Sequence, residues 1–129
     1  MVSRDTTVHL TVVALTMVGM TVALWLPSDP AVMAVVFAAY NGAVLAGAHL
    51  YLAWRGEDGL VPVASRWRFV AAVAAVLSLA ALAFVTDPVS LGPVTSDAVL
   101  RGGAVVVAVA YLVAEARDGY RESVAGTDI

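Results

Sequence analysis

Long apolar runs alternate with short polar interruptions along the chain. Hydrophobic residues dominate four stretches of 17 to 24 residues, at 8–26, 31–54, 67–85 and 98–114. A helix of about 20 residues crosses a hydrocarbon layer of about 30 Å. The pattern therefore predicts an all-α protein, a four-helix transmembrane bundle that forms a single integral membrane domain over residues 1–129.

Local signals predict where three of these helices begin. Asp29 precedes Pro30, and an aspartate accepts a hydrogen bond from the first helical turn, where proline loses nothing by lacking an N–H. We therefore expect a helix to begin at Pro30. By the same reasoning Ser65 is expected to cap the third helix, and Ser96 or Asp97 the fourth.

The distribution of arginine predicts the orientation in the membrane. Arginines precede the first run, flank the second connection and follow the fourth run, at positions 4, 55, 66, 68, 117 and 121. The first and third connections carry only aspartate as charged residues. Because cytoplasmic segments are enriched in Lys and Arg, we expect a multi-pass protein of the cell membrane with both termini cytoplasmic. The first run is longer than the core of a signal peptide, so we expect it to be retained.

Composition narrows the class of protein further. Hydrophobic residues make up 61% of the 129 residues and charged residues 13%, whereas soluble domains carry about 25% charged residues. The lipid bilayer is therefore the first expected partner. A net charge of -3 argues against nucleic acid binding. The absence of cysteine excludes disulfides and thiolate metal sites.

Residue usage adds a resemblance. All seven basic residues are arginine, and the chain is rich in alanine, valine, glycine and aspartate. In this style it resembles the small four-span membrane proteins common in haloarchaea, some of which look like products of genes beside respiratory complexes. The resemblance implies an accessory or assembly subunit of a membrane complex, and it transfers no functional residue.

Two further features concern the second half of the chain. Arg101 falls inside the fourth run, four residues after Asp97, which is the spacing of an ion pair on a helix. We interpret the pair as structural, with the arginine reaching outward to the interface. Residues 38–59 also match residues 98–119 at seven positions, which suggests two repeated helical hairpins.

A single histidine interrupts the second apolar run. On a regular helix His49 shares a face with Asn41, Gly42 and Ala46. Small and polar residues commonly form the contact between membrane helices, so this face is expected to point inward. Gly42→Leu should then be more disruptive than Gly47→Leu. The other stripe, expected to face lipid or a partner, contains Tyr40, Gly47 and Tyr51.

His9 is the expected partner of His49. It lies about 7.5 Å along a helix from Arg4, and His49 lies about 9 Å from Arg55. The first two helices are joined by a short connection, so the two imidazoles should meet near the cytoplasmic side. Thr16, seven residues after His9, would continue the polar line.

Three interpretations of the histidine pair stay open at the level of sequence. In the first, neutral imidazoles bond to neighbouring helices and fix their packing. In the second, His9 and His49 are axial ligands of a b-type haem, and in the third they form a proton-responsive site, as in a proton-coupled transport protein. Arginines near the haem propionates would be Arg4, Arg55, Arg66 or Arg68.

No catalytic constellation is recognisable in the sequence. Glu115, at the end of the fourth run, is expected to be a solvated charge rather than a general base. We therefore expect a non-catalytic accessory or assembly subunit of a membrane complex, for example a respiratory complex. Its partners would be other membrane subunits or further copies of itself, and the alternative is the haem or proton-coupled protein.

Overall fold

The computed structural model describes residues 1–126 and is mostly helical. Four helical segments are long and apolar enough to cross a membrane, which confirms this part of the prediction. The second segment, Pro30–Trp54, contains one π-helical turn, η1. The elements are α1 (Arg4–Ala23), α2 (Pro30–Gly42), η1 (Ala43–Gly47), α3 (Ala48–Trp54), α4 (Val63–Val85), β1 (Ser90–Leu91), β2 (Val94–Thr95) and α5 (Ser96–Ala125).

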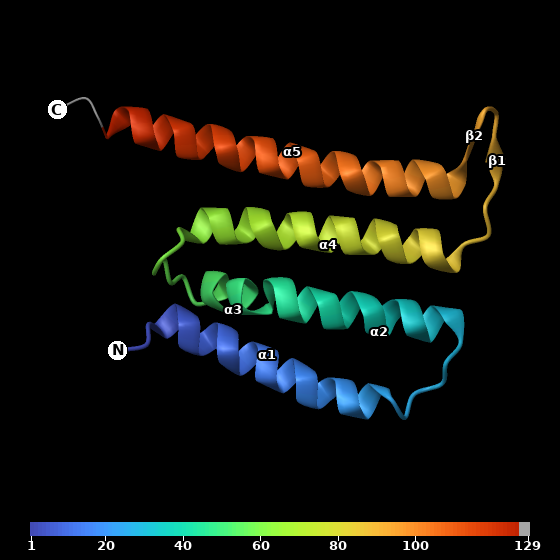
Figure 1. The fold of residues 1–129 in the computed structure, drawn as a ribbon, viewed down its shortest axis with the longest axis horizontal. Coiled ribbons are helices and arrows are strands. Elements are labelled where there is room, and N and C mark those ends of the chain that lie inside the picture. Colours follow the sequence, from blue (N-terminus) through green and yellow to red (C-terminus); the bar gives the residue numbers. More distant parts are fainter. Residues whose placement is uncertain (127–129) are drawn as a thin grey trace.

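The four spans lie side by side in chain order (Figure 1). The main contacts join α1 to η1 and α3, the second span to α4, and α4 to α5. Helices α1 and α5 therefore occupy opposite edges of an open row. Few side chains are buried, because most helix surface lies outside the seams between neighbouring spans.

Helix starts agree with the predicted caps at one of three positions. Asp29 caps α2 by accepting from the N–H of Val32, and Pro30 follows it, as expected. Helix α4 begins at Val63, whose N–H donates to Asp58, so the prediction that Ser65 caps it is wrong. The cap position of α5 is Thr95 rather than Ser96 or Asp97. The hydroxyl of Ser96 instead accepts from the N–H of Val89 in the preceding connection.

A short antiparallel hairpin, absent from the sequence prediction, precedes α5. Ser90 pairs with Thr95, and Leu91 with Val94. Gly92 turns the chain with a φ of +73°, a conformation that glycine adopts at no steric cost. Each strand has only two residues, which is too short for an alternating pattern to stand out.

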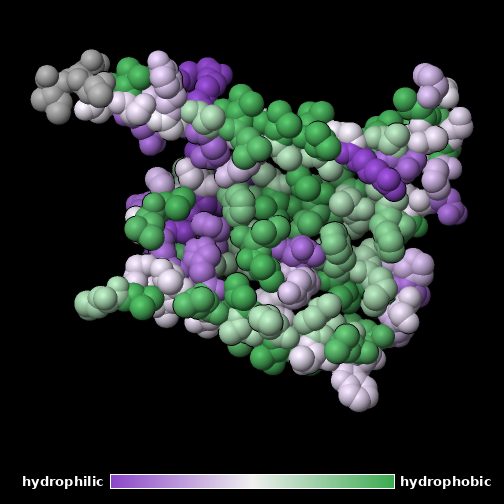
Figure 2. All heavy atoms as spheres, in the orientation of Figure 1, coloured by the Kyte–Doolittle hydropathy of each residue, from purple (hydrophilic) through white to green (hydrophobic). Residues whose placement is uncertain are grey.

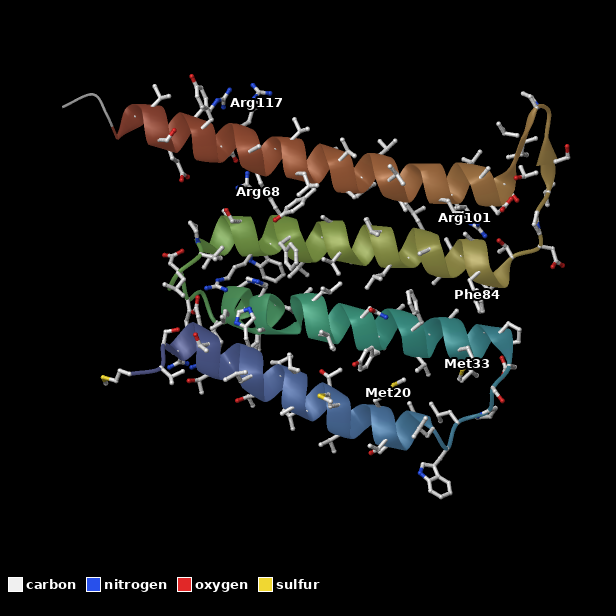
Figure 3. The ribbon with its side chains drawn as sticks, viewed as in Figure 1. Met20, Met33, Arg68, Phe84, Arg101 and Arg117 are labelled. Carbon is white, nitrogen blue, oxygen red and sulfur yellow. The ribbon has the colours of Figure 1, made fainter. Side chains whose placement is uncertain are left out.

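Charge is concentrated at one end of the row. Figure 2 shows hydrophilic residues toward both ends of the row, with the larger group on the side where α5 ends, whereas hydrophobic residues cover most of the middle of the face in view. Arg68 and Arg117 lie at this end, and Arg101 lies at the other (Figure 3). We call the first the arginine-rich end.

The two segments proposed as repeats end in different structures. Asp58 and Gly59 lie in the connection between α3 and α4, whereas their counterparts Asp118 and Gly119 lie inside α5. The first segment also contains the π turn, and the second is a regular helix. The similar endings therefore do not correspond to similar local folds.

Candidate functional site

A buried ion pair lies at the arginine-rich end. Arg66, in the first turns of α4, is 0% exposed, and its Nη2 lies 2.8 Å from Oδ2 of Asp5 in the first turn of α1. The same Nη2 donates to the carbonyl oxygen of Asp58 at 2.9 Å. A buried charge is tolerated when it is paired and hydrogen-bonded. The pair therefore ties the start of α1 to α4 and to the connection that precedes α4.

The connection between α3 and α4 packs closely against the carboxylate of Asp5. The N–H of Leu60 donates to Oδ2 of Asp5 at 3.1 Å. Gly59 beside it has a φ of +55°, and a Cβ at this position would stand 2.6 Å from Oδ1 of Asp5. Only glycine satisfies both the backbone conformation and the close approach.

The two histidines meet beside this ion pair. Nε2 of His9 lies 3.4 Å from Nε2 of His49, and the rings contact edge to face with their centroids 4.8 Å apart. The predicted proximity of His9 and His49 is therefore confirmed. Nδ1 of His49 is 3.1 Å from Nη1 of Arg66, and Nδ1 of His9 is 2.7 Å from the carbonyl oxygen of Asp5. We call Asp5, His9, His49 and Arg66 the polar cluster.

The partners determine where the protons of the two rings lie. A guanidinium only donates, so Nδ1 of His49 must accept from Arg66 and its proton must sit on Nε2. That proton points to His9, whose Nε2 therefore accepts. The proton of His9 is then on Nδ1 and is donated to the carbonyl of Asp5. Both rings are neutral in this arrangement, and each nitrogen has a partner.

The π turn changes which residues accompany His49. A π turn contains an extra residue, so positions before and after it do not follow the regular helical spacing. Ala46 is buried as predicted, but Asn41 donates to the carbonyl of Phe37 in its own helix rather than across to another. The buried residues near His49 are Ala46, Ala48, Leu52 and Ala53.

The glycine ranking predicted from this face is wrong. A Cβ on Gly47 would stand 2.9 Å from Cγ1 of Val12, whereas one on Gly42 would stand 3.6 Å from Cδ1 of Leu77, an ordinary contact. Gly47 is therefore a point of close approach between α1 and the second span. The ranking assumed a helix of regular pitch, and the π turn at residues 43–47 removes that assumption.

The remaining predicted polar residues lie apart from the cluster. The hydroxyl of Thr16 donates to the carbonyl of Val12 within α1, so it adds no bond between helices. Arg101 and Asp97 form the predicted pair at 3.8 Å, at the opposite end of the row and with the arginine 72% exposed. Neither contributes to the polar cluster.

A second set of contacts extends from the cluster to α5. His49 packs against Phe69, and Phe69 packs against Tyr111, with ring centroids 5.0 and 5.9 Å apart. Beside them Arg68 pairs with Asp118, and its Nε lies 3.2 Å from Glu115. Glu115, expected to be a solvated charge, therefore has a partner on α4. All four spans are joined at the arginine-rich end.

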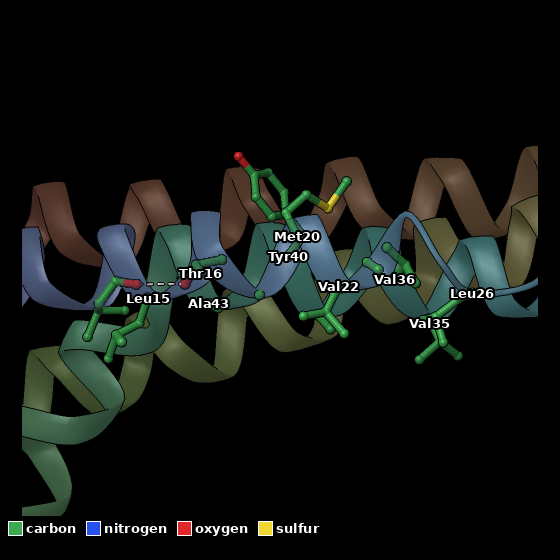
Figure 4. Close-up of a pocket in the computed structure, with 13 residues that line it drawn as sticks. Leu15, Thr16, Met20, Val22, Leu26, Val35, Val36, Tyr40 and Ala43 are labelled. Atoms are coloured by element: carbon green, nitrogen blue, oxygen red, sulfur yellow. Dashed lines mark hydrogen bonds between the residues drawn. The ribbon is translucent and has the colours of Figure 1, made fainter.

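Toward the other end, α1 and the second span separate. A cleft with a volume of about 550 Å³ lies between them and is lined almost entirely by apolar side chains (Figure 4). Thr16 is among its few polar residues, and its hydroxyl is already bonded to Val12. The residues that line the cleft include Leu15, Met20, Val22, Leu26, Val35, Val36 and Tyr40 (Figure 4).

Sequence reasoning missed Asp5 and considered Arg66 only as a marker of topology and a haem neighbour. Both signals were present, because each residue lies in the first turns of a helix at the same predicted membrane side. The estimate of position along the helices that placed His9 level with His49 would also have placed Asp5 level with Arg66. Among the residues that the structure describes, no group of three or more His, Asp or Glu side chains is placed to hold a metal ion.

No protein family, curated protein or solved structure matches this chain.

Proposed function

We propose that this is a membrane protein with both termini in the cytoplasm that serves as a non-catalytic accessory or assembly subunit of a membrane complex, such as a respiratory complex. The open row of helices carries the proposal. The accessible surface is 8770 Å², about 2,000 Å² more than expected for a compact protein of this mass. That excess is larger than the roughly 800 Å² that each partner buries in a standard interface between proteins.

The polar cluster supports a structural role. Both nitrogens of His9 and of His49 are occupied by groups of the chain itself. The ion pair of Arg66 with Asp5 is likewise internal. A cluster whose groups bond to one another holds helices in place, as polar contacts commonly do between membrane helices.

Assembly is the property to test. The tagged chain, expressed in its own cell and extracted with a mild detergent, should migrate on native gels within a complex containing other membrane subunits in fixed ratio. Removing the gene should lower the amount of that assembled complex. Migration as a monomer or only with copies of itself would contradict the proposal.

Tryptophan substitutions at exposed apolar positions would locate the interface. A position that faces lipid tolerates a large apolar ring, whereas one packed against another subunit does not. We expect assembly to be lost at some of these positions and kept at others, which then act as matched controls. The positions, on α1 and α5, are Leu15, Val18, Val106 and Val109.

The histidine pair motivates the alternative of a haem protein. A haem would have to lie between the two imidazoles, with its iron bound by His9 and His49. The Nε2 atoms here are 3.4 Å apart and in direct contact, so haem would require α1 and α3 to separate. We expect the purified protein to show no Soret band, and a band that His49→Leu abolishes would favour the haem function instead.

A further inference from the structure

The polar cluster contains three successive hydrogen bonds, and each uses one hydrogen atom. They lie between Arg66 and His49 at 3.1 Å, between His49 and His9 at 3.4 Å, and between His9 and the carbonyl of Asp5 at 2.7 Å. The guanidinium supplies the first hydrogen and the two neutral rings supply the others. Each of the three contacts therefore has one donor and one acceptor.

A fourth proton has no acceptor in this arrangement. On Nδ1 of His49 it would face the N–H of Arg66, and on Nε2 of His9 it would face the N–H of His49. Either position sets two donors against each other and adds a positive charge. Both rings are half-buried rather than sealed.

The charged groups around the histidines do not compensate the positive charge that a fourth proton would add. From α1 the cluster contains Asp5, but this carboxylate is already paired with Arg66 of α4 at 2.8 Å. The connection contributes the carbonyl of Asp58 to Arg66, and its Glu57 pairs with Arg4 at 2.7 Å. On α3 the group in the cluster is His49 itself.

The polar contacts of α1 with other segments lie at the arginine-rich end. They come from Arg4, Asp5 and His9. One turn further Val12 lies against Gly47, and beyond it the apolar cleft begins. The most apolar stretch of α1 has no residue buried in the protein. The longest of the three hydrogen bonds, between His9 and His49, is the one that links α1 to α3.

We propose that the contact between His9 and His49 is a proton-sensitive latch. One proton bound by the pair breaks this contact, and α1 pivots about the ion pair of Asp5 with Arg66. The pivot moves the far part of α1 away from the second span and widens the cleft between them. The latch is independent of the accessory function proposed above, because it follows from the hydrogen-bond pattern alone.

Distances between spin labels test this movement in the full chain. The sequence contains no cysteine, so labels attach only where cysteine is introduced. Val18→Cys on α1 and Val106→Cys on α5 are both exposed and report on the edge-to-edge distance. Val35→Cys on α2 with the same Val106→Cys is the control pair, because it omits α1.

The labelled proteins would be measured in phosphatidylcholine nanodiscs at about pH 8 and about pH 5, on either side of the imidazole range. We expect the distance from α1 to α5 to lengthen by about 2 Å or more at the lower pH, as in other helix shifts. The control distance should stay constant. An unchanged distance from α1 to α5, or an equal change in the control pair, would overturn the latch.

Replacing both histidines with glutamine removes the titration while keeping polar side chains. The His9→Gln, His49→Gln protein should therefore lose the pH response, and an undiminished response would assign it to another group. Nitrogen NMR of the imidazoles in the unsubstituted chain is a second measurement that needs no variant. At high pH it should show the proton on Nδ1 of His9 and on Nε2 of His49. Conversion to imidazolium in a different pH range from the distance change would overturn the proposal.

Discussion

The guanidinium of Arg66 joins four segments of the chain at one point. It bonds to Asp5 of α1, to His49 of α3 and to the carbonyl of Asp58 in the connection, while its own backbone belongs to α4. A buried charge with this many partners is costly to leave without them, since the remaining partners stay out of water.

Arg66→Met should be far more damaging than Arg68→Met. Arg66 is 0% exposed, so its loss leaves Asp5 as an uncompensated buried charge, at a cost of about 3–5 kcal/mol. Arg68 is 43% exposed, and ion pairs at the surface contribute little because water screens them. Titration with SDS in mixed micelles measures both free energies of unfolding. Equal losses would show that the ion pair of Arg66 is not buried.

Gly59→Ala and Gly56→Ala form a second matched comparison. Both glycines have positive φ, so each alanine should cost about 1–2 kcal/mol in backbone strain. Only at Gly59 would the new Cβ also meet Asp5, because nothing lies within 4 Å at Gly56. The unfolding free energy should therefore fall further for Gly59→Ala, by about 1–3 kcal/mol for the added overpacking. Identical values would exclude the contact with Asp5.

At the scale of elements, the π turn decides how the second span presents its side chains. It falls at Ala43–Gly47, just before the helix turn that carries His49. In this span Gly47 lies against Val12 of α1, and Asn41 bonds within its own helix. Such turns frequently occur at functional positions, and here it lies beside the polar cluster.

Gly47→Ala should destabilise the protein, whereas Gly42→Ala should be neutral or mildly stabilising. Alanine gains up to about 1 kcal/mol over glycine inside a helix, and Gly42 has room for a Cβ. At Gly47 the Cβ would stand 2.9 Å from Val12, which forces α1 outward at a cost of about 1–3 kcal/mol. Adding Val12→Ala should restore stability. Failure of this rescue would place the close approach elsewhere.

At the scale of the whole molecule, an even number of spans brings the start of α1 and the end of α5 to the same end of the row (Figure 1). The arginines at positions 4, 55, 66, 68, 117 and 121 flank the helix ends there, and Arg101 belongs to the opposite end. Many large apolar side chains of the row are exposed. Topology and assembly are therefore the properties to measure at this scale.

Reporter fusions test the orientation. A reporter joined after Ile129 should be active only in the cytoplasm, and one inserted between Asp87 and Pro88 only on the outer side, because arginine-rich segments remain cytoplasmic. The two fusions control each other, since a reporter that is active on both sides indicates misinsertion. Export of the fusion at Ile129 would reverse the proposed orientation.

The amino-acid sequence by itself determined the number of spans, their approximate bounds and the meeting of His9 with His49. Helix length against membrane thickness sets the first two. The third follows because helical rise converts distance along the chain into depth. Asp29 before Pro30 likewise specifies a helix start through local hydrogen bonding alone. The spans, their bounds and this helix start depend on neighbours in the chain and on the membrane. The meeting of the histidines also needs the first two spans to be adjacent, which their short connection implies.

Only the tertiary structure decided that the spans form an open row, that Asp5 bonds to Arg66, and that Gly47 rather than Gly42 is the point of close approach. These features depend on which faces of separate helices meet. In lipid the apolar faces are nearly equivalent, because no hydrophobic force separates an inner face from an outer one. Which faces meet therefore depends on a few polar bonds and on local distortions such as the π turn. Neither can be inferred from the periodicity of apolar residues in the sequence.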